Sequence, residues 1–268
     1  MKAKPATRDW LPLARTAAGA GELPTGAAFR PEWIDCAKGI RVGNLEPHER
    51  ITQILKHHLE QTYRTPFVID RWGRGEYWQW ICWLPKANRK AKPLSHDVNF
   101  GCAKLFIGVD GERHMFQSGL QIERGYAAGP APFPGCLLQD DWDWHRLLKQ
   151  CRAGSGFDHA VQQLLRREGF VAEVGDWTDN AVFTAANYKS AGQIRAAVRH
   201  CPARQWAGFQ LYYPMPEREL RTCTGYELIK AVCAVFTAVV PAMNACLQVP
   251  LTPLSTAAPA VDIVPGDR

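Results

Sequence analysis

The chain has 268 residues, of which 46% are hydrophobic and 22% are charged. These values are close to the average of globular domains, so a wholly disordered, collagen-like or coiled-coil chain is excluded. The length suits one large domain or two small ones. The net charge of +6 comes from the first hundred residues, which hold 16 basic and 10 acidic side chains, whereas the remainder is balanced. A basic partner surface is therefore expected in the first part, where it favours a polyanionic partner.

Cysteine usage indicates a reducing compartment. The nine cysteines occur singly, with no CxxC pair and no zinc-ligand spacing. Several lie in apolar runs and are expected to be small buried hydrophobes. The first ten residues contain charges but no apolar stretch typical of a secretory signal. We therefore expect a cytoplasmic protein with no cofactor and no bound metal.

One apolar segment is long enough to be a candidate membrane span. Residues 231–251 contain no charged side chain, but they include Thr237, Pro241, Asn244 and Gln248. Many of the apolar residues are Ala and Val, which give a weak insertion signal. The segment is expected to be a buried core helix that ends near Pro241 or soon after, and no membrane partner is expected.

The composition divides the chain into three parts. Residues 1–45 are rich in Ala, Gly and Pro and show no helical or strand period, which predicts a loosely ordered arm. Residues 250–268 have the same character and are expected to form a peripheral tail. A single domain is expected over 46–249, in which 127–134 form a hinge or a surface loop.

The first half of this domain carries one helix and the clearest strands. Apolar residues at helical spacing predict a helix over 47–64. Strands are expected at 67–70 and 77–84, joined through a turn at 72–75. Further strands at 98–109 and 114–124 flank Asp110 and Gly111, a dipeptide that tolerates positive φ and favours a tight hairpin turn. The first strand of this hairpin is apolar on both faces and should be central.

The second half is mainly helical. Helices are expected at 140–151 and 157–168, a strand at 170–174 and another strand at 206–213. Ser190 with Gln193 and Thr224 with Glu227 form capping boxes, each opening a further helix. The element order predicts an α+β fold: a mainly antiparallel sheet with a central Asp-Gly hairpin, packed against several helices.

The most unusual segment, residues 71–92, combines tryptophans at positions 72, 78, 80 and 83 with six basic residues. A basic loop that neutralises phosphates beside an exposed tryptophan is the combination that single-strand nucleic-acid binders use. The alternative is that Trp78 and Trp80 on one strand face and Trp83 on the other are core residues, beside a solvated loop. The candidate nucleic-acid-binding residues are Arg71, Trp72, Arg74, Lys86, Arg89, Lys90 and Lys92.

A second candidate is a polar strand face. Gln117, Gln121 and Glu123 alternate with apolar residues, and His114 and Arg124 are near in sequence. Gln117, Gln121 and Arg124 can hydrogen-bond base edges or a small polar ligand, and Glu123 with His114 suits acid–base chemistry. Any solvent-facing strand has the same alternation.

A third candidate is the acidic run at 140–145, which holds Asp140, Asp141, Asp143 and His145. Three carboxylates and an imidazole suit a hard metal or a general base. The alternative is that the carboxylates lie in the first turn of a helix, where the helix dipole favours negative charge. Motifs for nucleotide-cradling loops, zinc proteases and serine hydrolases are absent from the sequence.

Two short stretches, FQSGL at 116–120 and FTAVVPAM at 236–243, resemble the YktB-like family of uncharacterised bacterial α+β proteins. In that family a comparable strand precedes helices and a terminal helix ends in a leucine-proline step. The resemblance implies a single-domain α+β fold and no activity that can be carried over to particular residues.

Three functional hypotheses follow. The first is a non-catalytic nucleic-acid-binding protein of the bacterial cytoplasm, or a subunit of a nucleic-acid-processing complex, with DNA or RNA as its partner. The second is a metal-dependent hydrolase or nuclease that uses Glu123 with His114, or Asp141 with His145. The third is a protein-interaction subunit of a larger assembly, whose Pro/Ala-rich ends are docking arms.

Overall fold

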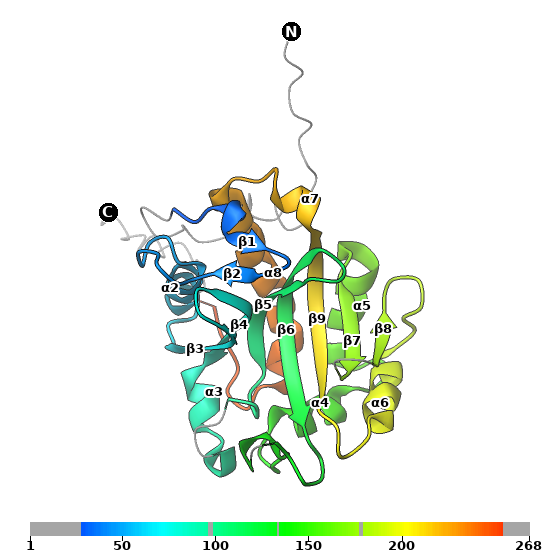
Figure 1. Ribbon diagram of the computed structural model, residues 1–268. Coiled ribbons are helices and arrows are strands. Elements are labelled where there is room, and N and C mark those ends of the chain that lie inside the picture. The colour runs from blue at the N-terminus through cyan, green and yellow to red at the C-terminus, as the bar shows by residue number, and fades with distance from the viewer. Residues whose placement is uncertain (1–27, 96–98, 133, 177–178, 254–268) are drawn as a thin grey trace, which may run out of the picture.

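The protein folds into two layers, one a β-sheet and the other a group of helices (Figure 1). The computed structural model describes residues 28–95, 99–132, 134–176 and 179–253. Every strand pair in the nine-stranded sheet is antiparallel. The α+β class and the mainly antiparallel sheet expected from the sequence are therefore confirmed.

The strand order is β1-β2-β4-β5-β6-β9-β7-β8, and β3 pairs with β4. The strands are β1 (Ile34–Asp35), β2 (Gly39–Arg41), β3 (Phe67–Arg74), β4 (Tyr77–Pro85), β5 (Lys104–Asp110), β6 (Met115–Gly125), β7 (Val171–Gly175), β8 (Asn180–Phe183) and β9 (Ala207–Pro216). The helices are α2 (Ile51–Tyr63), α3 (Lys86–Lys90), α4 (Asp143–Gln150), α5 (Gly156–Glu168), α6 (Ala191–His200), α7 (Glu217–Leu220) and α8 (Gly225–Cys246). Short 3₁₀ turns span Pro31–Trp33, Pro93–Ser95 and Pro134–Cys136.

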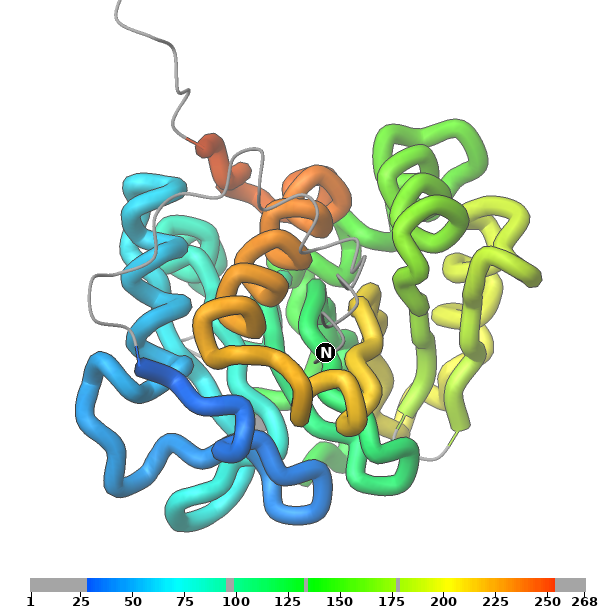
Figure 2. The backbone as a smooth tube through the Cα atoms, turned by 90° about the horizontal axis from the view of Figure 1, so that it is seen from above, coloured from blue at the N-terminus to red at the C-terminus, as the bar shows by residue number. Residues whose placement is uncertain are grey.

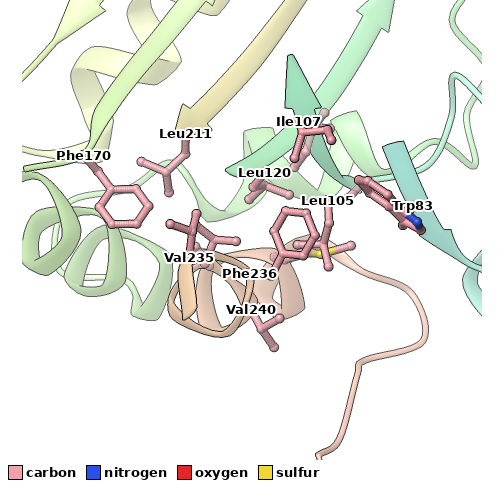
Figure 3. Packing of buried hydrophobic residues seen from close by; sticks show 14 of the residues in the cluster. Trp83, Leu105, Ile107, Leu120, Phe170, Leu211, Val235, Phe236 and Val240 are labelled. Carbon is pink, nitrogen blue, oxygen red and sulfur yellow. The ribbon is translucent and has the colours of Figure 1, made fainter. Parts of the chain in front are cut away.

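Helix α8 is the centre of the helical layer. It begins at the capping box of Thr224 and Glu227, as expected. Its apolar side chains pack against the sheet, where the ring centroid of Phe236 lies 5.7 Å from that of Trp83 (Figure 3). By length and composition α8 is apolar enough to cross a membrane, but 67% of its most apolar window is buried inside the protein. Pro241 lies within the helix, which continues to Cys246.

The other long helices cover the same sheet face as α8. Figure 2 shows α2, α5 and α8 on one side of the sheet. Buried residues of α4 and α6, such as Leu147 and Ile194, belong to the same apolar cluster as Leu105 and Leu120 of the sheet. Strand β5 lies between β4 and β6 and is apolar on both faces, which confirms its expected central position. The second face carries a small apolar cluster of its own, formed by Cys82, Leu84, Cys102, Phe106 and Tyr212.

The structure differs from the sequence predictions at both hairpins. Strand β3 continues to Arg74, so the first turn lies at residues 75–76 and not at 72–75. Asp110 pairs with Met115, so the loop of the second hairpin has four residues, 111–114. The positive φ in this loop falls on His114, at 48°, and not on Gly111. The Asp110 carboxylate stabilises the loop by accepting hydrogen bonds from the backbone of Glu112 and Arg113.

The prediction of a loose N-terminal arm is wrong for residues 28–45. Phe29, Ile34 and Ile40 are buried in the main core, and the short strands β1 and β2 join the sheet beside β4. Residues 1–27 lie outside the described residues. At the other end Leu251 is buried, and its backbone is held by the Asn244 side chain. The core therefore extends beyond both expected domain boundaries.

Seven of the nine cysteines are buried. Burial raises the pKa of the Cys102 thiol to about 11 and that of Cys151 to about 12. The expectation of small buried hydrophobes is therefore confirmed for these seven, and Cys201 and Cys223 are half-buried.

A buried polar cluster joins four parts of the chain. The Lys92 ammonium lies 2.8 Å from Asp143 Oδ1 and donates to Asn88. Asp143 Oδ2 accepts hydrogen bonds from Asn88 Nδ2 at 2.8 Å and from the Ala103 backbone at 2.7 Å. The Asn88 side chain in turn accepts from the backbone of Gln248, after α8. Because both charges are fully buried, removing either one leaves the other unpaired.

We expect Lys92→Met alone to lower the free energy of unfolding by about 3–5 kcal/mol. The double variant Lys92→Met, Asp143→Leu should cost less than the sum of its single substitutions, by up to about 3 kcal/mol, because no charge is left unpaired. Urea unfolding of the four proteins measures this coupling.

The matched control is the half-buried, solvent-accessible pair of Lys56 and Glu60 on α2, whose charged atoms are 3.7 Å apart. Its coupling should stay within about 0.5 kcal/mol. Equal coupling energies in the two pairs would contradict the structural role of the buried cluster.

Candidate nucleic-acid interface

The sheet face opposite α8 is not covered by the long helices (Figure 1), and we call it the open face. The pairing registers place side chains from several strands on it. One row across the sheet runs Trp72, Trp80, Gly108, Gln117 and Pro214. A parallel row contains Lys104, Gln121, Gln210 and Glu173. The open face therefore combines aromatic and polar side chains, in contrast to the apolar helix-covered face.

A hydrogen-bonded network lies at the centre of the open face. Lys104 forms an ion pair with Glu123, and both side chains are nearly fully buried. Burial lowers the pKa of Lys104, but the charge and hydrogen bond of Glu123, together with Cys82 and Cys102, outweigh it, so that the pKa lies above its ordinary value. The Gln121 side-chain oxygen accepts hydrogen bonds from Trp80 Nε1 at 2.9 Å and from Gln210 Nε2 at 2.8 Å. This network fixes the orientation of the Trp80 indole.

The expectation that this polar strand faces solvent is wrong, whereas a ligand-facing role for Gln117, Gln121 and Arg124 stays a prediction. Gln117, Gln121 and Glu123 are all buried, because neighbouring side chains cover them. Arg124 is buried too, and its guanidinium donates to the carbonyl oxygens of Cys201, Pro202 and Gln205. Burial lowers the pKa of this guanidinium. Arg124 thus braces the loop between α6 and β9.

Trp72 is the most exposed tryptophan among the described residues, with 66% of its surface accessible. It lies on β3 directly opposite Trp80, so the two side chains share the open face. A register shift between Trp72 and Gly73 places the next pair of the ladder, Gly73 and Trp78, on the helix-covered face. There Trp78 packs against the main core, and the Arg71 guanidinium lies 3.9 Å from its ring centroid.

This bulge corrects the expectation that Trp78 and Trp80 share a strand face. Trp78 and Trp83 both contact the main core, whereas Trp80 packs on the small cluster of the open face. Strict alternation along β4 predicts the opposite, because it takes no account of the extra residue in a bulge.

The predicted phosphate-binding residues divide into three groups. Arg71, Arg74, Lys86 and Lys90 are exposed, and Arg89 is half-buried. Lys92 is the exception: its ammonium is fully buried against Asp143, so it cannot contact a phosphate. The basic side chains of α3 also lie apart from Trp72. The Lys86 backbone bonds to Pro66, six residues from Trp72 along the extended chain, a separation of about 20 Å.

The proposed acid–base pair is not brought together. His114 and Glu123 lie at opposite ends of β6, nine residues or about 30 Å apart. His114 Nδ1 instead lies 3.1 Å from Glu217 Oε2.

The acidic run does not converge on a metal site either. Asp141 accepts a hydrogen bond from the Leu94 backbone, and His145 Nε2 is 3.1 Å from the Gln139 carbonyl oxygen. Only Asp143 of the three carboxylates lies within α4, where it forms the buried ion pair. The described residues contain no group of three or more His, Cys, Asp and Glu side chains arranged to hold a metal ion.

A second basic surface was not predicted from the sequence. Arg113, Arg218 and Arg221 line one depression although more than a hundred residues separate the first from the others. Their convergence depends on the pairing of β6 with β9, which brings the two ends of these strands together. Sequence spacing alone contains no signal for it.

Comparison with known proteins finds no matching family model, no matching curated protein and no matching solved structure.

Proposed function

We propose that this protein binds single-stranded nucleic acid, with Trp72 as the stacking platform on the open face. The observation that carries the proposal is the exposure of Trp72 opposite a second indole on an uncovered sheet. Trp72 and the half-buried Trp80 lie side by side and form a contiguous aromatic surface, the kind of surface that serves a partner. Aromatic side chains of this kind bind unpaired bases, because every base has a flat face that stacks.

The indole opposite Trp72 is held in place before any ligand binds. Trp72 is paired in the ladder with Trp80, and Trp80 is fixed by its hydrogen bond to Gln121. The Trp80 side chain therefore loses little conformational entropy when a ligand binds, which favours affinity. An RNA or DNA strand stacked here needs no base-specific contact, so we propose weak sequence preference.

Exposed cations along β3 support the same proposal. Arg74 lies two residues after Trp72, and Lys86 and Lys90 lie at the far end of the strand. Arg71 is exposed too, but its guanidinium lies on Trp78 at the opposite face. A nucleic acid segment that follows β3 would pass from the indole to these lysines over about 20 Å. Their interaction with phosphates would be electrostatic and dependent on salt. For the second hypothesis, a metal-dependent hydrolase or nuclease, the described residues bring no comparable group of metal-binding side chains together.

We expect Trp72→Ala to weaken binding of a labelled single-stranded oligonucleotide by roughly 5- to 100-fold, because one stacked base contributes about 1–3 kcal/mol. Fluorescence anisotropy at low salt measures the change. The matched control is Tyr226→Ala on α8, an aromatic residue that is 56% exposed away from the open face. Equal affinities for the two variants would remove Trp72 from the interface.

We expect Lys86→Ala with Lys90→Ala to reduce the slope of log affinity against log salt by roughly 1.4, about 0.7 for each lost phosphate contact. The control replaces Lys189 and Arg199, two exposed cations at the other end of the sheet. A slope that stays at the wild-type value in the α3 variant would show that the strand does not follow β3.

A further inference from the structure

A depression of about 520 Å³ lies where β6 and β9 end and α7 begins. It is open to solvent and is lined by Arg113, His114, Pro216, Glu217, Arg218 and Arg221. Three of the six lining residues carry a guanidinium group, against one carboxylate. The depression is therefore a concave surface with an excess of positive charge.

Two of the three guanidinium groups are held in place by carboxylates. Arg221 donates to Glu217 Oε1 at 2.7 Å, and His114 lies beside the other oxygen of the same carboxylate. These two contacts lower the pKa of Glu217, so its charge is retained at neutral pH. Arg113 donates to Glu173 Oε1 at 2.7 Å and also lies 3.4 Å from Asp110.

Arg218 differs from the other two. It is exposed, and within the described part of the chain it forms no ion pair. An arginine fork without a carboxylate partner, beside two oriented guanidinium groups, is the arrangement that recognises an oxyanion through several N–H donors.

We propose that this depression binds the phosphoryl group of a ligand through Arg218, with Arg113 and Arg221 as supporting cations. A phosphoryl group offers several acceptor oxygens at once, and arginine forks match its geometry. The volume lies in the range of small-molecule sites and exceeds the needs of a single free ion. The depression therefore has room for a molecule larger than a free phosphate ion.

Two sources can supply this group. One is a small phosphorylated molecule. The other is the terminal phosphate of a nucleic acid bound at Trp72. Pro214, two residues before the lining residue Pro216, lies in the same row across the sheet as Trp72. Four strand spacings, about 20 Å, separate Pro214 from Trp72. Only the second source depends on the proposed nucleic-acid function.

The test is a calorimetric titration with inorganic pyrophosphate at constant ionic strength. We expect the wild-type protein to bind with a dissociation constant of about 1 mM or below. Arg218→Gln should weaken binding by roughly 5- to 20-fold through the loss of charge-assisted hydrogen bonds. Because Arg218 is exposed and forms no ion pair in the described chain, this variant should fold as the wild type does, which its melting temperature checks.

The matched control is Arg199→Gln, an exposed arginine on α6 outside the depression, which should leave the affinity unchanged. The absence of binding by the wild type up to about 10 mM, or equal affinities for the two variants, would overturn the proposal. Trp72→Ala should bind pyrophosphate as tightly as the wild type, so failure of the nucleic-acid proposal is distinguishable from failure of this one.

A second arm identifies the source of the phosphoryl group. Single-stranded oligonucleotides with a 5′-phosphate or a 5′-hydroxyl are compared on the wild type and on Arg218→Gln. A preference for the 5′-phosphate that disappears in the variant assigns the group to the nucleic acid end. Pyrophosphate binding without such a preference supports a small phosphorylated molecule as the ligand.

Discussion

The buried carboxylate of Asp143 is the constraint on which much of the structure depends. It pairs with Lys92 and accepts from Asn88 and the backbone of Ala103, and Asn88 in turn holds the chain after α8. Taking two charges out of water is unfavourable, so the cluster is tolerated only because its donors and acceptors are paired. It also orients α3: Asn88 faces the interior, whereas Lys86 and Lys90 are left on the surface. The same interaction thus determines which basic residues are available to a ligand.

A second buried ion pair lies on the open face, at the centre of the sheet. Lys104 and Glu123 lie where the other face has leucine and isoleucine, and they are stabilised by each other. Their neighbour Gln121 is the shared acceptor for Trp80 and Gln210. A polar network of this kind adds geometric specificity to a two-layer sheet, because each group has a partner only in one arrangement. The Trp80 indole is therefore oriented by buried polar groups.

Local signals predicted the fold well, and signals that depend on tertiary context did not. The Ser190 and Thr224 capping boxes were located from the sequence because their hydrogen bonds join residues three apart. The polar alternation on β6 predicts a solvent-facing strand, yet the strand is buried, since a buried polar network and a solvent-exposed surface have the same sequence pattern. Lys92 was assigned to a phosphate contact because its partner Asp143 is 51 positions away in the chain. No single-sequence rule pairs such residues.

A count of charged residues along the sequence locates only some of the basic surfaces of the folded protein. The excess of positive charge lies in the first hundred residues, yet Lys92 from that region is fully neutralised by its buried partner. The balanced remainder of the chain supplies Arg113, Arg218 and Arg221, which the sheet brings to one depression. A distant anion is attracted by the net charge of a surface. A bound anion contacts the guanidinium groups that are not already paired with a carboxylate. Within the described residues Arg218 is such a group, and a count of basic residues along the chain gives it no more weight than Lys92.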